Sequence, residues 1–150
     1  MIIYQRLTSI LNQNQTIKAM DYSDNKYQPL ALLLLRLGVG IIFIVAGWGK
    51  LTDISSVQGF FADTGIPLAG VMAWVVAIVE FFGGILVVLG AYARIPYLLL
   101  AIIMVVALIT TKLGGGFGPA RLDLMLLLSS LALFLMGSGK YSFDFKMQNR

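Results

Sequence analysis

Two ionisable residues lie inside long apolar runs of this 150-residue chain, and any chemistry would be built around them. Arg36 falls within residues 29–49, and Glu80 falls within residues 68–89. A charged side chain at the centre of a lipid bilayer costs about 2.5–3.5 kcal/mol on insertion scales, so such residues usually face other protein groups. Because a guanidinium and a carboxylate form strong, charge-assisted hydrogen bonds, we predict an ion pair between Arg36 and Glu80.

The spacing of small residues supports inward-facing positions for both charges. Helices in lipid pack closely where small residues align, and polar groups on the same stripe then face protein. Counted along each helix from Leu30 and Leu89, Arg36 lies roughly 9 Å and Glu80 roughly 14 Å from the same membrane surface. The alternative is that Arg36 extends to the interface, while Glu80 is protonated and bonded to a hydroxyl or a carbonyl. The two stripes are Arg36, Gly40, Phe43, Gly47 and Lys50, and Gly70, Ala73, Ala77, Glu80 and Gly84.

A second group of charges is expected at the opposite membrane surface. Lys50 ends the first apolar run, Lys112 ends the third, and Arg121 and Asp123 open the fourth. Together they form a predicted non-cytoplasmic rim that binds an anion or a polar headgroup. The alternative is that the lysines are interfacial anchors and that Arg121 and Asp123 flank the start of a helix.

The residue types that are missing restrict the chemistry. The sequence contains no Cys and no His, so thiol exchange and the usual ligands of haem, iron–sulfur and zinc centres are excluded, and no metal site is expected. No nucleotide-binding fingerprint or nucleophile motif is present. The catalytic residues therefore stay unknown, and an oxidoreductase activity would need a partner protein.

The elements that position these residues are four apolar helices. Hydrophobic residues make up 59% of the chain and the mean hydropathy is +0.88, above the level of soluble domains. A membrane-spanning helix needs about 20 predominantly apolar residues. The predicted spans are about 29–49, 68–89, 95–113 and 122–137, and their short connections predict an all-α, up-down-up-down four-helix bundle in the membrane.

The segments outside the spans predict the orientation. Residues 1–28 are predicted to form a cytoplasmic segment. Its apolar spacing fits an interfacial amphipathic helix, and the alternative is a loosely ordered polar tail. Residues 29–145 are predicted to form the membrane domain, and residues 146–150 a short basic tail. Seven basic residues flank the side of both termini and three flank the other side, so both termini are predicted to be cytoplasmic. The net charge of +4 indicates attraction to anionic lipids rather than nucleic-acid binding.

Several short motifs, in this order and spacing, resemble those of the DoxX family over about residues 30–145. They are the run from Leu35 to Gly40, Gly47-Trp48-Gly49-Lys50-Leu51, Gly65-Ile66-Pro67, Glu80-Phe81-Phe82-Gly83-Gly84, Gly90 with Arg94, Asp123, and the ending from Gly137 to Asp144. The resemblance implies a small four-span protein of the bacterial or archaeal cytoplasmic (inner) membrane.

The resemblance also implies links to quinone-dependent oxidoreductase and oxidative-stress complexes. The first hypothesis is an accessory redox component in which Arg36 and Glu80 bind a quinone and relay its proton, while a partner subunit supplies electrons. The second is a structural or lipid-binding scaffold with no redox role. No covalently bound cofactor is expected; a quinone, membrane lipids, a redox partner subunit and a second copy of the chain are the expected ligands and partners.

Overall fold

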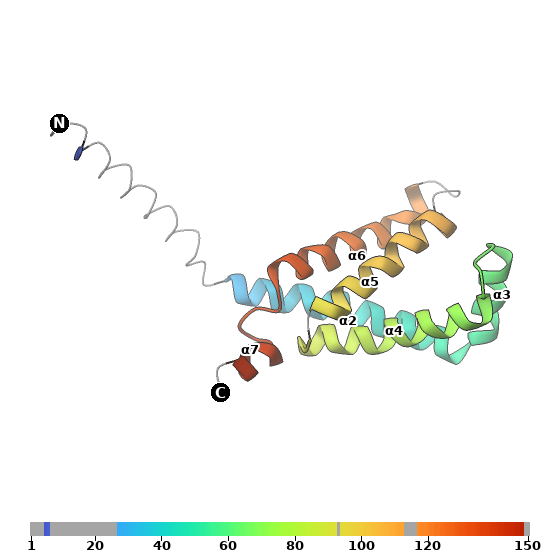
Figure 1. Cartoon of the computed structure of the whole chain (residues 1–150), viewed down its shortest axis with the longest axis horizontal. Coiled ribbons are helices and arrows are strands. Elements are labelled where there is room, and N and C mark those ends of the chain that lie inside the picture. Colours follow the sequence, from blue (N-terminus) through green and yellow to red (C-terminus); the bar gives the residue numbers. More distant parts are fainter. Residues whose placement is uncertain (1–4, 7–26, 93, 113–116, 149–150) are drawn as a thin grey trace.

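The computed structural model describes residues 5–6, 27–92, 94–112 and 117–148, and the regular elements in these ranges are all helices. The predicted N-terminal interfacial helix lies almost wholly outside the described residues. The elements, drawn in Figure 1, are α2 (Gln28–Thr52), α3 (Ile54–Asp63), α4 (Ala69–Leu89), α5 (Arg94–Ala107), a π-helical turn η1 (Leu108–Lys112), α6 (Phe117–Met136) and α7 (Phe143–Gln148).

The two helices that carry Arg36 and Glu80 are long and apolar enough to cross a membrane. α2 has 25 residues and α4 has 21. At about 1.5 Å per residue, α4 alone spans roughly 31 Å, which matches the ~30 Å hydrocarbon core. The all-helical prediction is confirmed, and both helices end within three residues of their predicted bounds. The four-span bundle and the cytoplasmic termini stay predictions.

The second half of the chain departs further from its predicted bounds. The apolar helix predicted over 95–113 is α5, whose last turn widens into η1. The span predicted over about 122–137 falls on α6, which begins five residues earlier, at Phe117. Pro119 falls in the first turn of α6, where a backbone N–H has no intrahelical acceptor, so the proline is tolerated.

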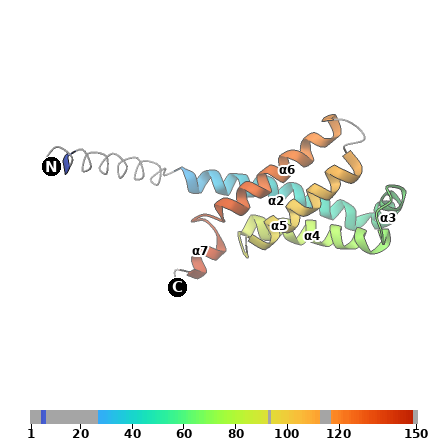
Figure 2. The same cartoon turned by 45° about the horizontal axis from the view of Figure 1, so that its top comes forward.

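The connection between α2 and α4 contains a helix of its own. α3 begins after Asp53, whose carboxylate accepts a hydrogen bond from the backbone N–H of Ser56 at 3.4 Å. Hydrogen bonds from the Ser56 side chain and backbone, and then from Ser55, hold the pKa of Asp53 below its ordinary value of 3.8. Such an N-cap stabilises the first turn. Figures 1 and 2 both place α3 at one end of the molecule and α7 at the other.

α2 and α4 pack closely because glycines remove the side chains between them. A Cβ atom placed on Gly40 would lie 2.9 Å from the carbonyl oxygen of Gly84, and one on Gly47 would collide with the backbone of Phe81. The two helices therefore run antiparallel, with residue 40 beside 84 and residue 47 beside 81. α5 and α6 lie together in both views and close the core with Tyr97, Leu100, Met104, Leu126 and Leu133.

Candidate functional site

The Arg36 side chain is buried, with 1% of its surface exposed, and its hydrogen bonds go to backbone carbonyl groups. Nε donates to the oxygen of Val87 at 3.0 Å, and Nη2 donates to that of Val88 at 2.7 Å. Nη1 donates to the oxygens of Ser138 at 2.8 Å and Tyr141 at 3.4 Å. All three guanidinium nitrogens are therefore engaged within the protein.

The acceptors belong to the ends of two other helices. Val87 and Val88 lie in the last turn of α4, where carbonyl groups lack their usual partners four residues on and the helix dipole favours a cation. The Val87 carbonyl also accepts the backbone N–H of Gly90. Gly90 then turns the chain with φ of +66°, and a Cβ atom there would collide with the Arg36 guanidinium. Ser138 and Tyr141 follow the end of α6. Arg36 thus ties the ends of α4 and α6 to α2.

The predicted Arg36–Glu80 ion pair is wrong. Val87, the first acceptor of Arg36 on α4, lies seven residues beyond Glu80, which is roughly 10 Å along a helix. The antiparallel register set by the glycines brings Arg36 level with the end of α4, and it brings Glu80 level with the last turns of α2. The inward orientation of both charges is confirmed, since Glu80 has 2% of its surface exposed.

The partner of Glu80 is Lys50. Lys50 Nζ donates to Glu80 Oε2, and the two side chains form the ion pair found among the described residues. The Glu80 side chain is 3% exposed, whereas that of Lys50 is 28% exposed. The lysine stem reaches from the last turn of α2 to the buried carboxylate, so the pair joins the protein interior to its surface.

Two aromatic residues neighbour this pair along α2 and α4, and a second carboxylate lies within electrostatic range of Glu80. The rings of Trp48 and Phe81 lie 5.8 Å apart with an interplanar angle of 40°, and Trp48 is largely exposed. Asp123, near the start of α6, is close enough to Glu80 to repel its charge. We call the group Lys50, Glu80, Asp123, Trp48 and Phe81 the Glu80 site.

The structure brings together only part of the predicted rim. Lys50 and Asp123 both belong to the Glu80 site, whereas the Arg121 side chain is exposed on α6. Lys112 ends η1, but its side chain, like residues 113–116, falls outside the described part. The structure therefore links two rim residues to the intramembrane carboxylate, a link that the sequence interpretation missed. The signal that could have revealed it was Gly47, because a glycine there lets α2 pack against α4 at Phe81 and so places Lys50 near Glu80.

The sequence interpretation also missed the acceptors of Arg36, because backbone carbonyls carry no residue signature. The indirect signal was glycine at the expected helix ends. Gly90 and Gly137 both take positive φ there, as glycines that end helices commonly do. Each marks a place where carbonyl groups need partners.

Comparison with known proteins identifies the family. The family model DoxX matches residues 31–113, more than half of the chain. The chain belongs to the DoxX family. The resemblance predicted from the sequence motifs is thereby confirmed, and with it the assignment as a membrane protein.

The relatives of this DoxX protein carry general names. "Putative oxidoreductase CatD" of Bacillus subtilis is 40% identical over 121 residues, which cover 80% of this chain and 89% of that protein. "Inner membrane protein YqjF" of Escherichia coli is 30% identical over 123 residues, which cover 79% of this chain and 93% of that protein. "Inner membrane protein YphA" of Escherichia coli is 26% identical, with 86% and 97% covered. No solved structure matches the chain significantly.

Proposed function

We propose that this DoxX protein is an accessory component of a quinone-linked redox or oxidative-stress complex in a bacterial or archaeal inner membrane. The observation that carries the proposal is the Lys50–Glu80 pair, in which a buried carboxylate meets a partly exposed ammonium. Support also comes from the relative in Bacillus subtilis whose name is that of an oxidoreductase. The Glu80 site replaces the Arg36/Glu80 site of the sequence hypothesis.

The residues of the Glu80 site suit a flat, weakly polar headgroup. An ammonium group has three N–H donors, of which Glu80 takes one, so Lys50 retains donors for a carbonyl oxygen. Trp48 and Phe81, which neighbour Lys50 and Glu80 in the sequence, pack ring against ring and supply aromatic surface for a flat ligand. Glu80 holds the ammonium in place and can exchange a proton with it.

A quinone bound at this site would supply two-electron, two-proton redox chemistry. The chain has no Cys or His, so we assign the electron transfer to a partner subunit. Lys50 and Glu80 bind, orient and hold a proton, and the partly exposed face of Lys50 connects them to water at the membrane surface.

Quinone binding can be measured through Trp48. In the Trp74→Phe background, Trp48 is the remaining tryptophan, and decylubiquinone is titrated into the purified full chain in lipid nanodiscs. We expect saturable quenching, and an affinity about tenfold weaker in Lys50→Met, the value for about 1.4 kcal/mol of lost hydrogen bonding. Arg121→Met is the control for loss of a cation and should bind normally. Unsaturable quenching, or equal affinities in both variants, would contradict the proposal.

A second candidate, a structural or lipid-binding scaffold without redox function, is favoured by the contacts of Arg36. Its bonds all run to backbone carbonyls of two helix ends, as expected of a residue that fixes how helices meet. Under this proposal the intact fold alone matters. The partner complex would then assemble and function normally with Glu80→Gln and with Lys50→Met, and it would fail to assemble with Arg36→Met. The quinone proposal instead expects the complexes with Glu80→Gln and Lys50→Met to assemble but to lack quinone turnover.

A further inference from the structure

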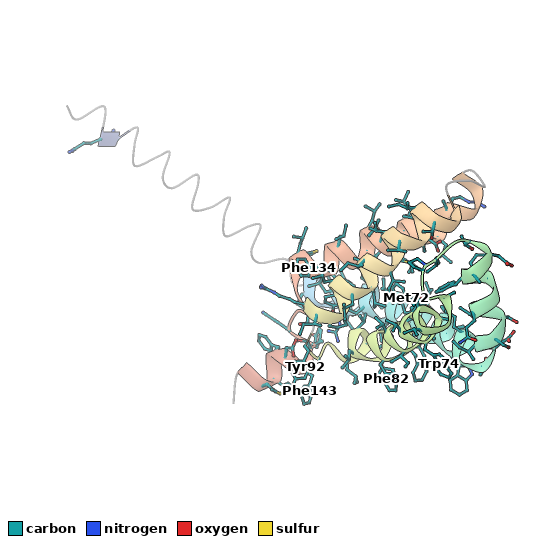
Figure 3. All side chains as sticks on the ribbon, turned by 45° about the vertical axis from the view of Figure 1, so that its right-hand side comes forward. Met72, Trp74, Phe82, Tyr92, Phe134 and Phe143 are labelled. Carbon is teal, nitrogen blue, oxygen red and sulfur yellow. The ribbon has the colours of Figure 1, made fainter. Side chains whose placement is uncertain are left out.

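A cavity of about 580 Å³, lined by charged, hydroxyl-bearing and apolar residues, lies at the end of the molecule opposite the Glu80 site. The turn between α4 and α5 forms one wall, and the segment from the end of α6 into α7 forms the other. Its lining includes Tyr92, Arg94, Lys140, Asp144 and Phe145. Figure 3 shows Tyr92 and Phe143, from these two walls, at the same end of the molecule.

The charges that line this cavity favour an anion. Arg94 and Lys140 are exposed, and neither forms an ion pair among the residues that the structure describes. Asp144 is the acidic residue of the lining, and its oxygens already accept hydrogen bonds from the Tyr92 backbone N–H at 2.9 Å and the Ser138 hydroxyl at 3.4 Å. Two cations therefore face one carboxylate that is engaged by the protein, which leaves a net positive lining.

An apolar groove of about 350 Å³ continues from the cavity along the outer faces of α4 and α5. Tyr92 and Ile95 line both spaces, so the cavity and the groove adjoin at these two residues. The groove then follows Leu86, Phe82 and Ile78 on α4, and Figure 3 shows Phe82 between Tyr92 and Trp74 along this outer edge. From Leu86 to Ile78 the groove covers roughly 12 Å of helix, close to the ~15 Å depth of one leaflet.

We propose that this cavity and groove form a specific site for an anionic phospholipid. Arg94 and Lys140 bind the phosphate-bearing headgroup, the cavity holds it beside the α4–α5 turn, and one acyl chain lies against Leu86, Phe82 and Ile78. A positive headgroup site that adjoins an apolar groove of leaflet depth fits a lipid. Free phosphate would leave the groove empty. An uncharged quinone would leave the two cations without an anion. The site is separate from the Glu80 site and does not depend on the proposed quinone role.

The bound lipid would also support the contacts that Arg36 makes. Ser138 contributes its carbonyl to Arg36 and its hydroxyl to Asp144, and Asp144 in turn binds the backbone of the α4–α5 turn. A headgroup that bridges Arg94 and Lys140 would join the same two walls from outside. We therefore expect lipid binding to stabilise this end of the molecule.

Native mass spectrometry of the purified full chain tests the proposal. Phosphatidylglycerol and phosphatidylcholine with identical acyl chains are added separately, and retained adducts are counted. We expect retention of phosphatidylglycerol and its loss by about tenfold or more in Arg94→Gln/Lys140→Gln, since each basic residue near an anionic surface contributes about 1 kcal/mol. The control Arg121→Gln/Lys146→Gln loses the same charge outside the cavity and should retain the lipid.

The groove is tested by Leu99→Trp, which adds bulk to its lining without changing charge and should weaken phosphatidylglycerol retention. Equal losses in both double variants would mean general surface attraction and would overturn the site. Equal retention of phosphatidylcholine and phosphatidylglycerol, or retention of decylubiquinone that falls in Arg94→Gln/Lys140→Gln, would overturn its assignment to an anionic phospholipid. Quenching of Trp48 by quinone should be unchanged in that variant, so the two proposals fail independently.

Discussion

Replacement of Arg36 by methionine should destabilise the protein more than replacement of any exposed basic residue. Methionine keeps a long, apolar stem but removes the guanidinium, whose three shortest hydrogen bonds are 2.7, 2.8 and 3.0 Å. A hydrogen bond to a charged group contributes about 1.5–3 kcal/mol, so three bonds set an upper range of roughly 4.5–9 kcal/mol. Removal of a buried cation also relieves its desolvation cost, which lowers the expected loss to about 3–5 kcal/mol of unfolding free energy.

Denaturation of the purified protein in mixed micelles with increasing SDS measures this loss. The matched control is Arg121→Met, which makes the same chemical change at an exposed position and should cost about 1 kcal/mol or less, since exposed charge interactions contribute little. Arg36→Lys keeps the charge but has a single nitrogen, so it should fall between the two. Hydrogen exchange should increase in residues 86–92 and 137–145, where the carbonyl acceptors lie.

The contacts of Arg36 with the ends of α4 and α6 predict which segments should loosen as well as how much stability should be lost. Gly90→Ala leaves Arg36 in the chain but places a Cβ atom against its guanidinium, at a backbone φ of +66°. It should therefore increase exchange in the same two segments. Equal stability of Arg36→Met and Arg121→Met, or a loss of stability without faster exchange at the α4–α5 turn, would refute the reasoning.

Three further predictions concern the opposite end of the molecule. A double-mutant cycle of Lys50→Met and Glu80→Gln should show about 1–3 kcal/mol of coupling in unfolding free energy, and coupling near zero would refute the ion pair. Gly47→Ala should lower the free energy of unfolding by about 1–3 kcal/mol or more and weaken that coupling, because its Cβ atom would meet the α4 backbone. The control Gly49→Ala meets nothing within 4 Å and should be tolerated. Melting in detergent measures both variants. Because hydrogen bonds lower the pKa of Asp53 in the folded state, its contribution to α3 is complete above the unfolded pKa and is lost as the pH falls through the folded pKa. The protection factors of the α3 amides, which are corrected for the intrinsic pH dependence of exchange, should therefore fall at acidic pH in the wild type and change less in Asp53→Asn.

The sequence was sufficient to predict which faces of α2 and α4 meet. The small-residue stripes contain Gly40, Gly47, Ala73, Ala77 and Gly84, all of which are buried, and both intramembrane charges lie on the same faces. The positions of small residues in the sequence predict the packed faces directly, because close helix packing in lipid requires small side chains. Gly70 is the exception, since it lies exposed in the first turn of α4.

The partners of the charges could not be predicted in the same way. The depth argument assumed that Arg36 would seek an acidic side chain, but its acceptors are backbone carbonyls, among them those of Val87 and Val88 at a helix end. Every helix end presents such carbonyls whatever its sequence. The partner of Glu80 was likewise hidden, because Lys50 at the end of its helix could reach inward or outward, and only the register of α2 against α4 decides which.

The different partners give the two intramembrane charges different chemical capacities. The three guanidinium nitrogens of Arg36 are engaged by backbone carbonyls, so its capacity is to hold helix ends together. Lys50 and Glu80 together are neutral whether the proton resides on the nitrogen or on the carboxylate, so its transfer between them changes no net charge in the membrane.

Donation of a proton from this pair to a bound ligand would leave a net negative charge, which a low-dielectric interior opposes. The proton must therefore be replaced, and the side chain that reaches the protein surface is that of Lys50, which is 28% exposed, against 3% for Glu80. A proton-handling role therefore requires Lys50 to stay at the surface end of the pair. Reversal of the pair in Lys50→Glu/Glu80→Lys would bury the amine and expose the carboxylate, and it should preserve the fold better than either single change while it lowers the affinity for decylubiquinone.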